Sequence, residues 1–293
     1  MAEKENPQNE IDEISGVETT GHEWDGIREL NNPLPRWWLW TFYACIIWAI
    51  GYMIAYPAIP LIKGNTPGLL GYSSRADVAR EIEAAKEGQV TFLDMISQSE
   101  VSDIIANDEL ARFARAGGQA AFKVNCSQCH GSGAQGSVGF PNLNDDEWIW
   151  GGSAQDIYLT IAHGVRYEED FDTRFNEMPA FGAFGILSRE EIQTVASYTA
   201  FLGGLEGGQD SEEGALIFEN NCAACHGPGG LGEPALGAPP LNNAISLYAG
   251  NLESIVAQVN TPQHGVMPGW TEKLGDTVVK QLAVYVHSLG GGE

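Results

Sequence analysis

The sequence predicts an all-α chain in which one transmembrane helix near the N-terminus is followed by two tandem copies of a small helical domain. Three observations indicate this fold class. Residues 37–62 form an apolar run without a charged side chain. The pentapeptide Cys-x-x-Cys-His occurs twice, at residues 126–130 and 222–226. The stretches around the two copies also match each other residue by residue, as expected of a duplicated domain.

The N-terminal segment, residues 1–36, is polar and acidic, and we expect residues 1 to about 20 to be disordered. The apolar run that follows is long enough for a membrane helix: from Trp37 to Tyr56, about 20 residues rising about 1.5 Å each cover about 30 Å. Pro57 then marks the exit of the helix. A cleaved signal peptide is the alternative, but the run is too long and the preceding segment too acidic for one. We therefore expect a retained single anchor over residues 37–62.

An arm, residues 63–108, connects the anchor to the first motif. Ser74 and Asp77 resemble a capping box and predict a helix over residues 75–87 that Gly88 ends. A second amphipathic stretch follows over residues 92–105. Because so many residues of the arm are predicted to be helical, we favour a docking arm over a passive spacer.

An internal repeat defines the two domains. Phe122 before the first motif matches Phe218 before the second, and each copy closes with a helical pattern centred on Tyr198 or Tyr285. Glycine ends each closing helix. The predicted domains, joined by a short linker at residues 203–209, span residues 109–204 and 210–293.

The Cys-x-x-Cys-His motif is the attachment pattern of c-type haem. Each cysteine can form a thioether bond to one vinyl group, and the adjacent histidine becomes the proximal iron ligand. The alternatives are a zinc site built from both cysteine pairs and a thioredoxin-like dithiol, which requires a βαβ setting. The fifth cysteine, Cys45, lies in the apolar run and is expected to be inert. The candidate residues for two covalently bound haem c groups are Cys126, Cys129, His130, Cys222, Cys225 and His226.

Two Met-Pro pairs, at Met178 and Met267, are candidates for the sixth iron ligand. The methionine thioether is a soft ligand that raises the haem potential and suits electron transfer. His163 and His264 occur just before these pairs and compete for the same role. The sequence leaves open whether each methionine serves the haem of its own domain or of the other.

The net charge of −24 excludes nucleic acid as a natural partner. It favours a positively charged partner, of which a basic soluble cytochrome c is the obvious class. Solubility alone is the other interpretation of this charge. The first copy also carries an insertion of about 12 residues, 166–177, which is rich in acidic and aromatic side chains. The acidic stretches are residues 145–147, 168–172 and 210–213.

Two resemblances add to this interpretation. A motif helix, a Met-Pro loop and a closing helix with a tyrosine resemble the class I cytochrome c fold. Residues 19–38, Thr-Thr-Gly-His-Glu-Trp-Asp-Gly-Ile-Arg-Glu-Leu-Asn-Asn-Pro-Leu-Pro-Arg-Trp-Trp, resemble the N-terminal signature of the dihaem subunit III of cbb3-type cytochrome c oxidases, the CcoP/FixP family. This second resemblance covers the whole chain.

The resemblance implies a subunit without substrate chemistry of its own. It would pass electrons from a soluble cytochrome c towards a monohaem cytochrome subunit and the catalytic haem–copper subunit, which reduces dioxygen to water and pumps protons. A free-standing membrane dihaem cytochrome, a dihaem peroxidase and a gas sensor are the alternatives.

The charges flanking the anchor are nearly balanced, so the positive-inside rule does not orient it. Bacteria attach haem c on the outer side of the inner membrane. We therefore expect a single-pass protein of the bacterial inner membrane, with a cytoplasmic N-terminus and periplasmic haem domains.

Overall fold

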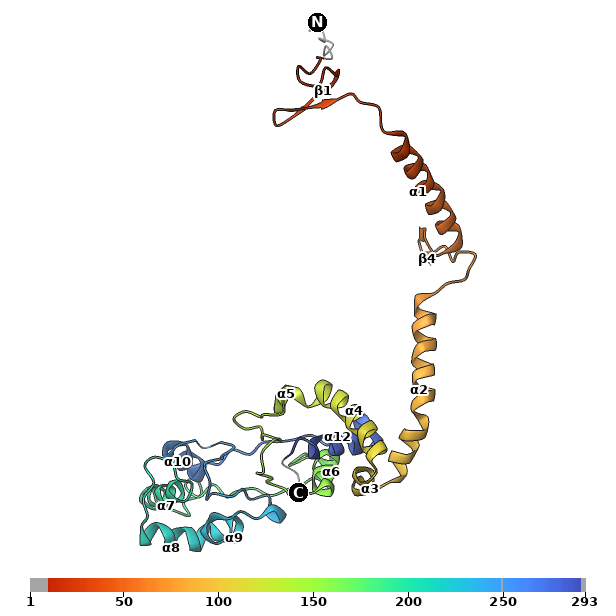
Figure 1. The fold of residues 1–293 in the computed structure, drawn as a ribbon. Coiled ribbons are helices and arrows are strands. Elements are labelled where there is room, and N and C mark those ends of the chain that lie inside the picture. The colour runs from red at the N-terminus through yellow and green to blue at the C-terminus, as the bar shows by residue number, and fades with distance from the viewer. Residues whose placement is uncertain (1–9, 249, 291–293) are drawn as a thin grey trace. The chain divides into compact units, whose positions relative to one another are not determined.

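The computed structural model describes residues 10–248 and 250–290 of the chain (Figure 1). The chain divides into two compact units, Met1–Lys86 and Glu87–Glu293. The first unit contains the hairpin and the apolar helix, and the second contains both Cys-x-x-Cys-His motifs.

The N-terminal segment contains a β-hairpin that the sequence analysis did not predict. Strands β1 (Thr19–Trp24) and β2 (Ile27–Leu30) pair antiparallel. Asp25 and Gly26 turn the chain with positive φ angles of 50° and 83°, which a two-residue hairpin turn requires. The all-α expectation is therefore not confirmed here. Residues 10–18, expected to be disordered, also include a β-bridge, and residues 1–9 lie outside the described part.

Helix α1 (Arg36–Ala55) is a candidate membrane span, with a mean hydropathy of 1.6 over its best window. All its side chains are at least partly exposed. The helix ends before Pro57, because Tyr56 precedes this proline and is extended, at φ −115° and ψ 159°. It is therefore shorter than the expected span of residues 37–62. Two short strands, β3 (Pro60–Leu61) and β4 (Gly64–Asn65), follow.

The arm forms one long helix instead of two shorter ones. Helix α2 (Ser74–Gln98) continues through Gly88, which was expected to end it, and α3 (Val101–Ala106) follows. The Ser73 hydroxyl, one residue before the predicted cap, accepts a hydrogen bond from the Ala76 N–H at 3.3 Å. A Cβ atom built on Gly88 would have no atom of another element within 4 Å, so this position lies on an open side of the helix.

The first core of the second unit is formed by α4 (Asp108–Asn125), α6 (Ala154–His163) and α12 (Asp276–His287), with the short helices α5 (Ser127–His130) and α11 (Thr271–Leu274) beside them. The Asn107 side chain caps α4 by accepting from the N–H groups of Glu109 and Leu110. Its buried stripe, which includes Leu110, Ala114 and Phe122, faces this core.

The second core is formed by α7 (Arg189–Leu202), α8 (Glu212–Asn221) and α10 (Leu252–Asn260), with α9 (Ala223–His226) after α8. The predicted linker between domains, residues 203–209, connects two helices of this one core. It folds back on α7, because the Gln209 N–H donates to the Ser197 carbonyl at 3.1 Å. Helices α7 and α8 are therefore packed neighbours, and the predicted boundary near residue 204 separates two parts of one core.

The tandem arrangement is not confirmed, because the closing helices are exchanged between the two copies. A Cβ atom built on Gly118 of α4 would lie 2.7 Å from the Tyr285 Cβ of α12. In the same way, a Cβ on Gly214 of α8 would lie 2.7 Å from the Tyr198 Cβ of α7. Each closing helix therefore packs on the motif helix of the other copy, with glycine permitting the close approach.

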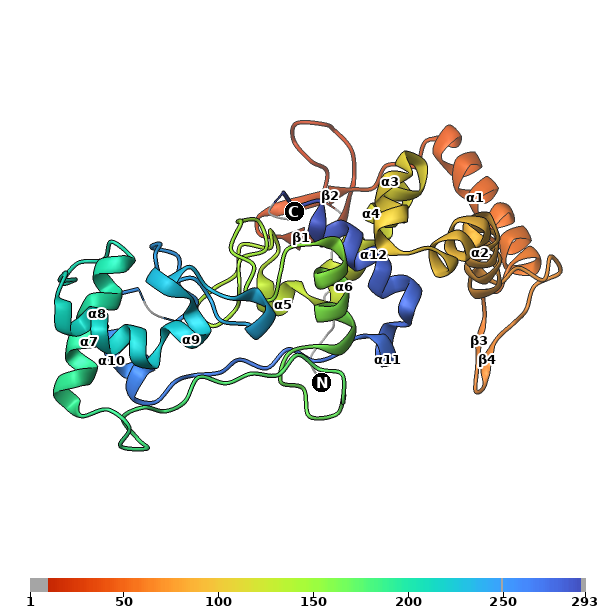
Figure 2. The ribbon, with the colours of Figure 1, turned by 90° about the horizontal axis from the view of Figure 1, so that it is seen from below.

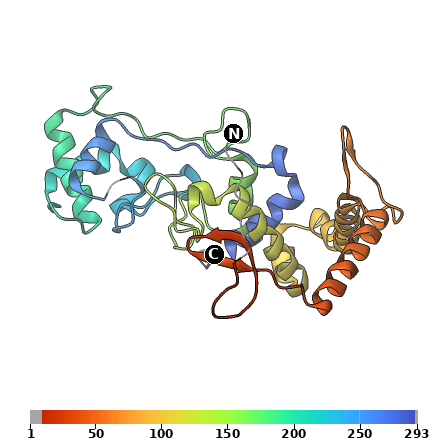
Figure 3. The same ribbon diagram turned by 90° about the horizontal axis from the view of Figure 1, so that it is seen from above.

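Two extended segments join the cores. Figures 2 and 3 show the chain after α6 and the chain before α11 running side by side between the two groups of helices. Val165 and Met267 exchange both backbone hydrogen bonds across these segments, at 2.9 and 3.0 Å. The Ala183 N–H donates to the Asn260 carbonyl at 3.1 Å at the other end. These bonds connect residues from the two copies at several points.

Candidate haem-binding sites

The first motif lies where α4 ends and α5 begins. The Cys126 N–H still bonds to the Phe122 carbonyl, and His130 is 9% exposed. The His130 Nδ1 lies 3.1 Å from the Pro141 carbonyl oxygen. A carbonyl can only accept, so Nδ1 carries the proton and Nε2 keeps its lone pair. This is the arrangement in which a histidine can bind a metal through Nε2.

The second motif repeats this geometry. The His226 Nδ1 lies 2.9 Å from the Pro239 carbonyl oxygen. Burial lowers the pKa of both imidazoles, and the bond to the proline carbonyl opposes this shift. Both side chains therefore stay neutral near pH 7, as a metal-binding imidazole must.

The two proline acceptors were missed in the sequence, although a signal was present. Pro141 begins the sequence Pro-Asn-Leu-Asn and Pro239 begins Pro-Pro-Leu-Asn, each shortly after its motif. This shared Pro-x-Leu-Asn pattern extends the internal repeat. It would have identified the residues that set the histidine tautomers.

The cysteines do not have the properties of a redox dithiol or of a zinc site. Burial, with a smaller contribution from the neighbouring cysteine, raises the pKa of Cys126 and of Cys222 to about 11 each. Reactive dithiols instead have a lowered pKa. A four-cysteine zinc site requires both pairs in one place. Within the described residues, His163, Asp170 and Asp172 are the one group of three potential ligands that come together.

Each Met-Pro pair packs against the core that contains the motif helix of the other copy. Met178 also lines a cavity of about 220 Å³ together with Cys222, Cys225 and His226. Met267 packs against the first core, as Cys126 does. In their packing, the two methionines therefore follow the exchange of the closing helices.

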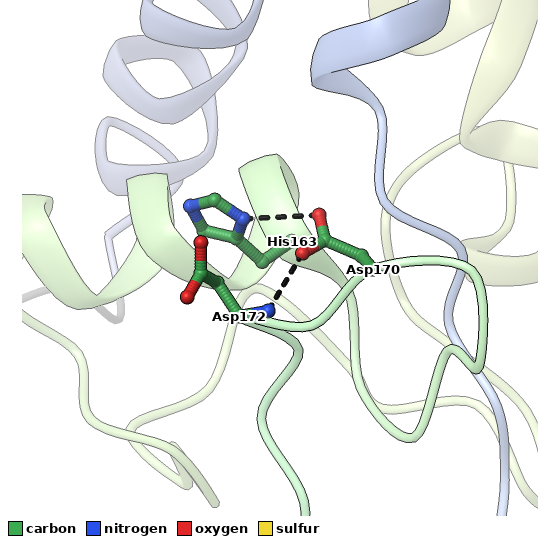
Figure 4. A group of neighbouring side chains, drawn as sticks. All are labelled: His163, Asp170 and Asp172. Carbon is green, nitrogen blue, oxygen red and sulfur yellow. Dashed lines mark hydrogen bonds and ion pairs between the residues drawn. The ribbon is translucent and has the colours of Figure 1, made fainter.

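The two competing histidines have other partners. The His163 Nδ1–H donates to the Asp170 carboxylate at 3.0 Å (Figure 4). The His264 Nε2 accepts from the Met178 N–H at 3.0 Å. Burial also lowers the pKa of His264, which keeps Nε2 available as an acceptor. His264 lines the cavity and holds the backbone of the methionine segment in place.

The same cavity has a polar wall that the sequence analysis missed. Arg166 donates through Nε to the Gly265 carbonyl at 2.8 Å and through Nη1 to the Asn176 carbonyl at 2.9 Å. The Tyr248 hydroxyl is buried and has no hydrogen-bond partner among the described residues. An arginine and a free hydroxyl in one cavity fit a ligand that carries carboxylates, as haem does. Arg166 comes from the insertion in the first copy, and no sequence signal pointed to Tyr248.

Two family models match this chain. The one described as the N-terminal domain of cytochrome oxidase-cbb3, FixP, matches residues 16–63. The one described as cytochrome c oxidase, cbb3-type, subunit III matches residues 114–198 and 209–286. The first match includes the hairpin and α1, and the second includes both candidate haem sites.

Similar proteins are known from several bacteria. The chain is 55% identical over 294 residues to a cbb3-type cytochrome c oxidase subunit FixP of Sinorhizobium medicae, with all of both chains covered. It is 50% identical to a subunit CcoP of Cereibacter sphaeroides, covering 94% of this chain and 95% of that one. It is 49% identical to a subunit CcoP of an Azospirillum species, covering 98% and 99%.

Proposed function

The chain belongs to the FixP/CcoP family, subunit III of the cbb3-type cytochrome c oxidases. From this membership and from the geometry of the two sites, we propose how the chain works as the electron-transfer subunit of its oxidase. In the proposal, the chain would hold two covalent haem c groups and receive electrons from a soluble basic cytochrome c. The electrons would go on to the monohaem subunit and then to the catalytic haem–copper subunit, which alone reduces dioxygen.

The observation that carries the proposal is the matched geometry of the two motifs. In each, a histidine, buried at His130 and half-buried at His226, donates through Nδ1 to a proline carbonyl and leaves Nε2 free, with a cysteine pair beside it. In the proposal, Cys126 and Cys129 hold one group and Cys222 and Cys225 the other. Haem c supplies reversible one-electron chemistry when bound.

We assign the sixth ligands in exchanged order. Met267 is proposed to serve the site of His130, and Met178 the site of His226. The shared cavity of Met178 and His226 supports this assignment, as does the packing of Met267 against the first core. A methionine in the sixth position closes the iron to gas ligands and favours electron transfer over peroxide chemistry.

Three further side chains act around the second site. His264 fixes the backbone of Met178, so that the thioether is presented in one position. Arg166 and the Tyr248 hydroxyl would donate to the haem carboxylates and hold the group in its cavity. Because Arg166 belongs to the first copy and Tyr248 to the second, both copies contribute to this one site.

We propose that α1 anchors the protein in the bacterial inner membrane, with the N-terminus cytoplasmic and both haem sites periplasmic. The length and hydropathy of α1 support an anchor, and the membrane-bound nature of the oxidase agrees with it. Covalent haem attachment outside the inner membrane supports the orientation. A proteolysis experiment on sealed vesicles, with a tag on either end of the chain, checks this orientation.

The exchanged ligands can be tested in a chain that retains only one haem. In a Cys126→Ala/Cys129→Ala background, we expect one covalent haem and half the haem stain. Met178→Ala in this background should open the remaining haem to carbon monoxide, whereas Met267→Ala should leave it closed. The mirror background, Cys222→Ala/Cys225→Ala, should reverse the two responses.

The outcomes separate the possible assignments. If Met267→Ala opens the haem of the second motif, each ligand serves its own copy. If neither variant opens a haem, the methionines are not the ligands. Purification of the full chain in mild detergent should also recover a haem–copper subunit, and its absence would contradict the role in an oxidase.

A further inference from the structure

Most of the insertion of the first copy lies in a closed loop, residues 164–175, which we call the Phe171 loop. Its two ends are joined by backbone hydrogen bonds. The Arg166 N–H donates to the Arg174 carbonyl at 2.8 Å, and the Arg174 N–H donates to the Gly164 carbonyl at 3.2 Å. The loop is therefore a defined projection from the end of α6 rather than an open connection.

The tip of this loop is ordered and yet presents a large apolar side chain to solvent. The Tyr167 N–H donates to the Thr173 hydroxyl at 3.0 Å, and the Thr173 N–H donates to the Asp170 carbonyl at 3.3 Å. Between these bonds, Phe171 is 106% exposed. An exposed aromatic side chain on a hydrogen-bonded backbone is costly in water, and aromatic side chains are common anchors of protein interfaces.

A histidine and two aspartates hold the tip against α6. Figure 4 shows the Asp170 carboxylate between the His163 ring and the backbone of Asp172. It accepts from His163 Nδ1 at 3.0 Å and from the Asp172 N–H at 2.8 Å. The bond from Asp172, followed by that from His163, lowers the pKa of Asp170. The carboxylate that fixes the loop is thus ionised near pH 7.

The positive and the negative side chains of the loop point in opposite directions. Its two arginines turn inward. Arg166 donates to the Gly265 carbonyl, and Arg174, whose side chain is 17% exposed, bonds to Asp156 at 2.9 Å. The carboxylates of Glu168, Glu169 and Asp172 are exposed. The outer surface of the loop therefore combines an apolar tip with a negative rim.

Three carboxylates of the other acidic stretches have a structural role. Glu147 accepts a hydrogen bond from the Asn243 side chain at 2.6 Å. Glu212 and Glu213 lie in the first turn of α8, where negative charge stabilises a helix. In the Phe171 loop, Glu169 accepts a hydrogen bond from the Tyr167 hydroxyl, a contact within the loop itself, and the Phe171 side chain is fully exposed.

The loop also lies next to one of the proposed haem-ligand segments. It begins beside Val165, whose backbone pairs with that of Met267. An open hollow of about 420 Å³ adjoins it, lined by Tyr167, Pro268, Gly269, Trp270, Glu272 and Lys273. A partner bound to the loop would thus also lie against the Met267–Pro268 segment.

We propose that the Phe171 loop is the docking site of the soluble electron donor, a cytochrome with an apolar surface patch surrounded by lysines and arginines. Phe171 inserts into the patch, and the negative rim steers the approach of the positive partner. The inference rests on the proposed function, because it names the surface through which electrons from the donor reach this subunit.

The test uses the detergent-purified oxidase with its full chain and a reduced, lysine-rich soluble cytochrome c as the probe. Stopped-flow spectroscopy measures the second-order rate of donor oxidation. Phe171→Ala should lower this rate about tenfold. Glu168→Gln/Glu169→Gln should lower it about threefold at low ionic strength and flatten its dependence on salt.

Matched controls lie elsewhere on the same unit. Phe184 is 73% exposed, so Phe184→Ala removes a comparable aromatic side chain, and Glu212→Gln/Glu213→Gln removes the same number of charges. Both controls should keep the wild-type rate within about twofold. Reduction of the haems by a small uncharged mediator should be unchanged in every variant.

Equal rates in Phe171→Ala and Phe184→Ala would overturn the docking site. So would loss of the oxidase subunits from the purified Phe171→Ala complex, because the loop would then be an assembly contact. In both cases the proposed function still stands. Failure of the wild-type chain to pass electrons from any reductant to the haem–copper subunit would instead overturn the proposed function.

Discussion

The exchanged packing of α4 and α12 makes a strong prediction about Gly118. A Cβ atom at this position would lie 2.1 Å from the Gln281 carbonyl oxygen and 2.7 Å from the Tyr285 Cβ. A carbon atom normally approaches a carbonyl oxygen to about 3.3 Å, so α12 must retreat by about 1 Å. Because the obstacle is backbone, no rotation of a side chain can relieve it.

The change in the free energy of unfolding caused by Gly118→Ala is the sum of two opposing effects. Overpacking of this kind costs about 1–3 kcal/mol, while replacing glycine with alanine in a helix returns about 0.5–1 kcal/mol. The 2.1 Å approach to the Gln281 carbonyl oxygen is short enough for the upper end of the overpacking cost. Gly118→Ala should therefore lower the free energy of unfolding by about 2 kcal/mol. For a unit of about 200 residues this corresponds to a fall in Tm of about 4–8 °C.

The measurement is thermal unfolding of the haem-loaded protein, followed by circular dichroism. Gly88→Ala is the matched control, because Gly88 lies inside α2 with no atom within 4 Å of a built Cβ. This control should keep or raise the Tm. If Gly118→Ala unfolds at or above the wild-type temperature, α4 and α12 are not in close contact. The closing helices would then not be exchanged between the two cores.

Three further predictions concern other parts of the second unit. Ser188→Ala should cost about 1 kcal/mol in thermal unfolding, because the Ser188 hydroxyl accepts from the Glu191 N–H at 3.2 Å in the capping box of α7. Arg166→Gln should lower the potential of one haem in a redox titration and leave the other unchanged, since it removes a positive charge from one cavity. Burial raises the pKa of Asp276, but bonds from Tyr158 and Lys280 outweigh this and keep the pKa below its usual value. The wild type should therefore lose stability as the pH falls below about 4, whereas Asp276→Asn should show a smaller loss in acid unfolding curves.

The sequence predicts local features well because they depend on neighbouring residues. The end of α1 follows from Pro57, and the two motifs identify the candidate histidines and cysteines. The hairpin was also predictable, because the pair Asp25-Gly26 is a typical two-residue hairpin turn. It was missed because the rest of the chain has a strong helical pattern. Gly88 shows the opposite error, since one glycine costs too little to end a long helix.

The exchange between copies could not be predicted from one sequence, for a physical reason. Gly118 and Gly214 match each other, as do Tyr198 and Tyr285, so every helix pair has the same complementary surfaces. Packing within a copy and packing between copies would look alike at these positions. The difference lies in the long connections, where Val165 pairs with Met267 and Met178 with His264.

The exchanged closing helices have a consequence for how the protein is made. The first core needs α12, which follows every other described helix in the chain, whereas α7 is already present when α8 emerges from the ribosome. The second core can therefore close before the first one does. Under the proposed function, the first motif would stay accessible for haem attachment until α12 has been made, and truncation before α12 should leave the first core incomplete.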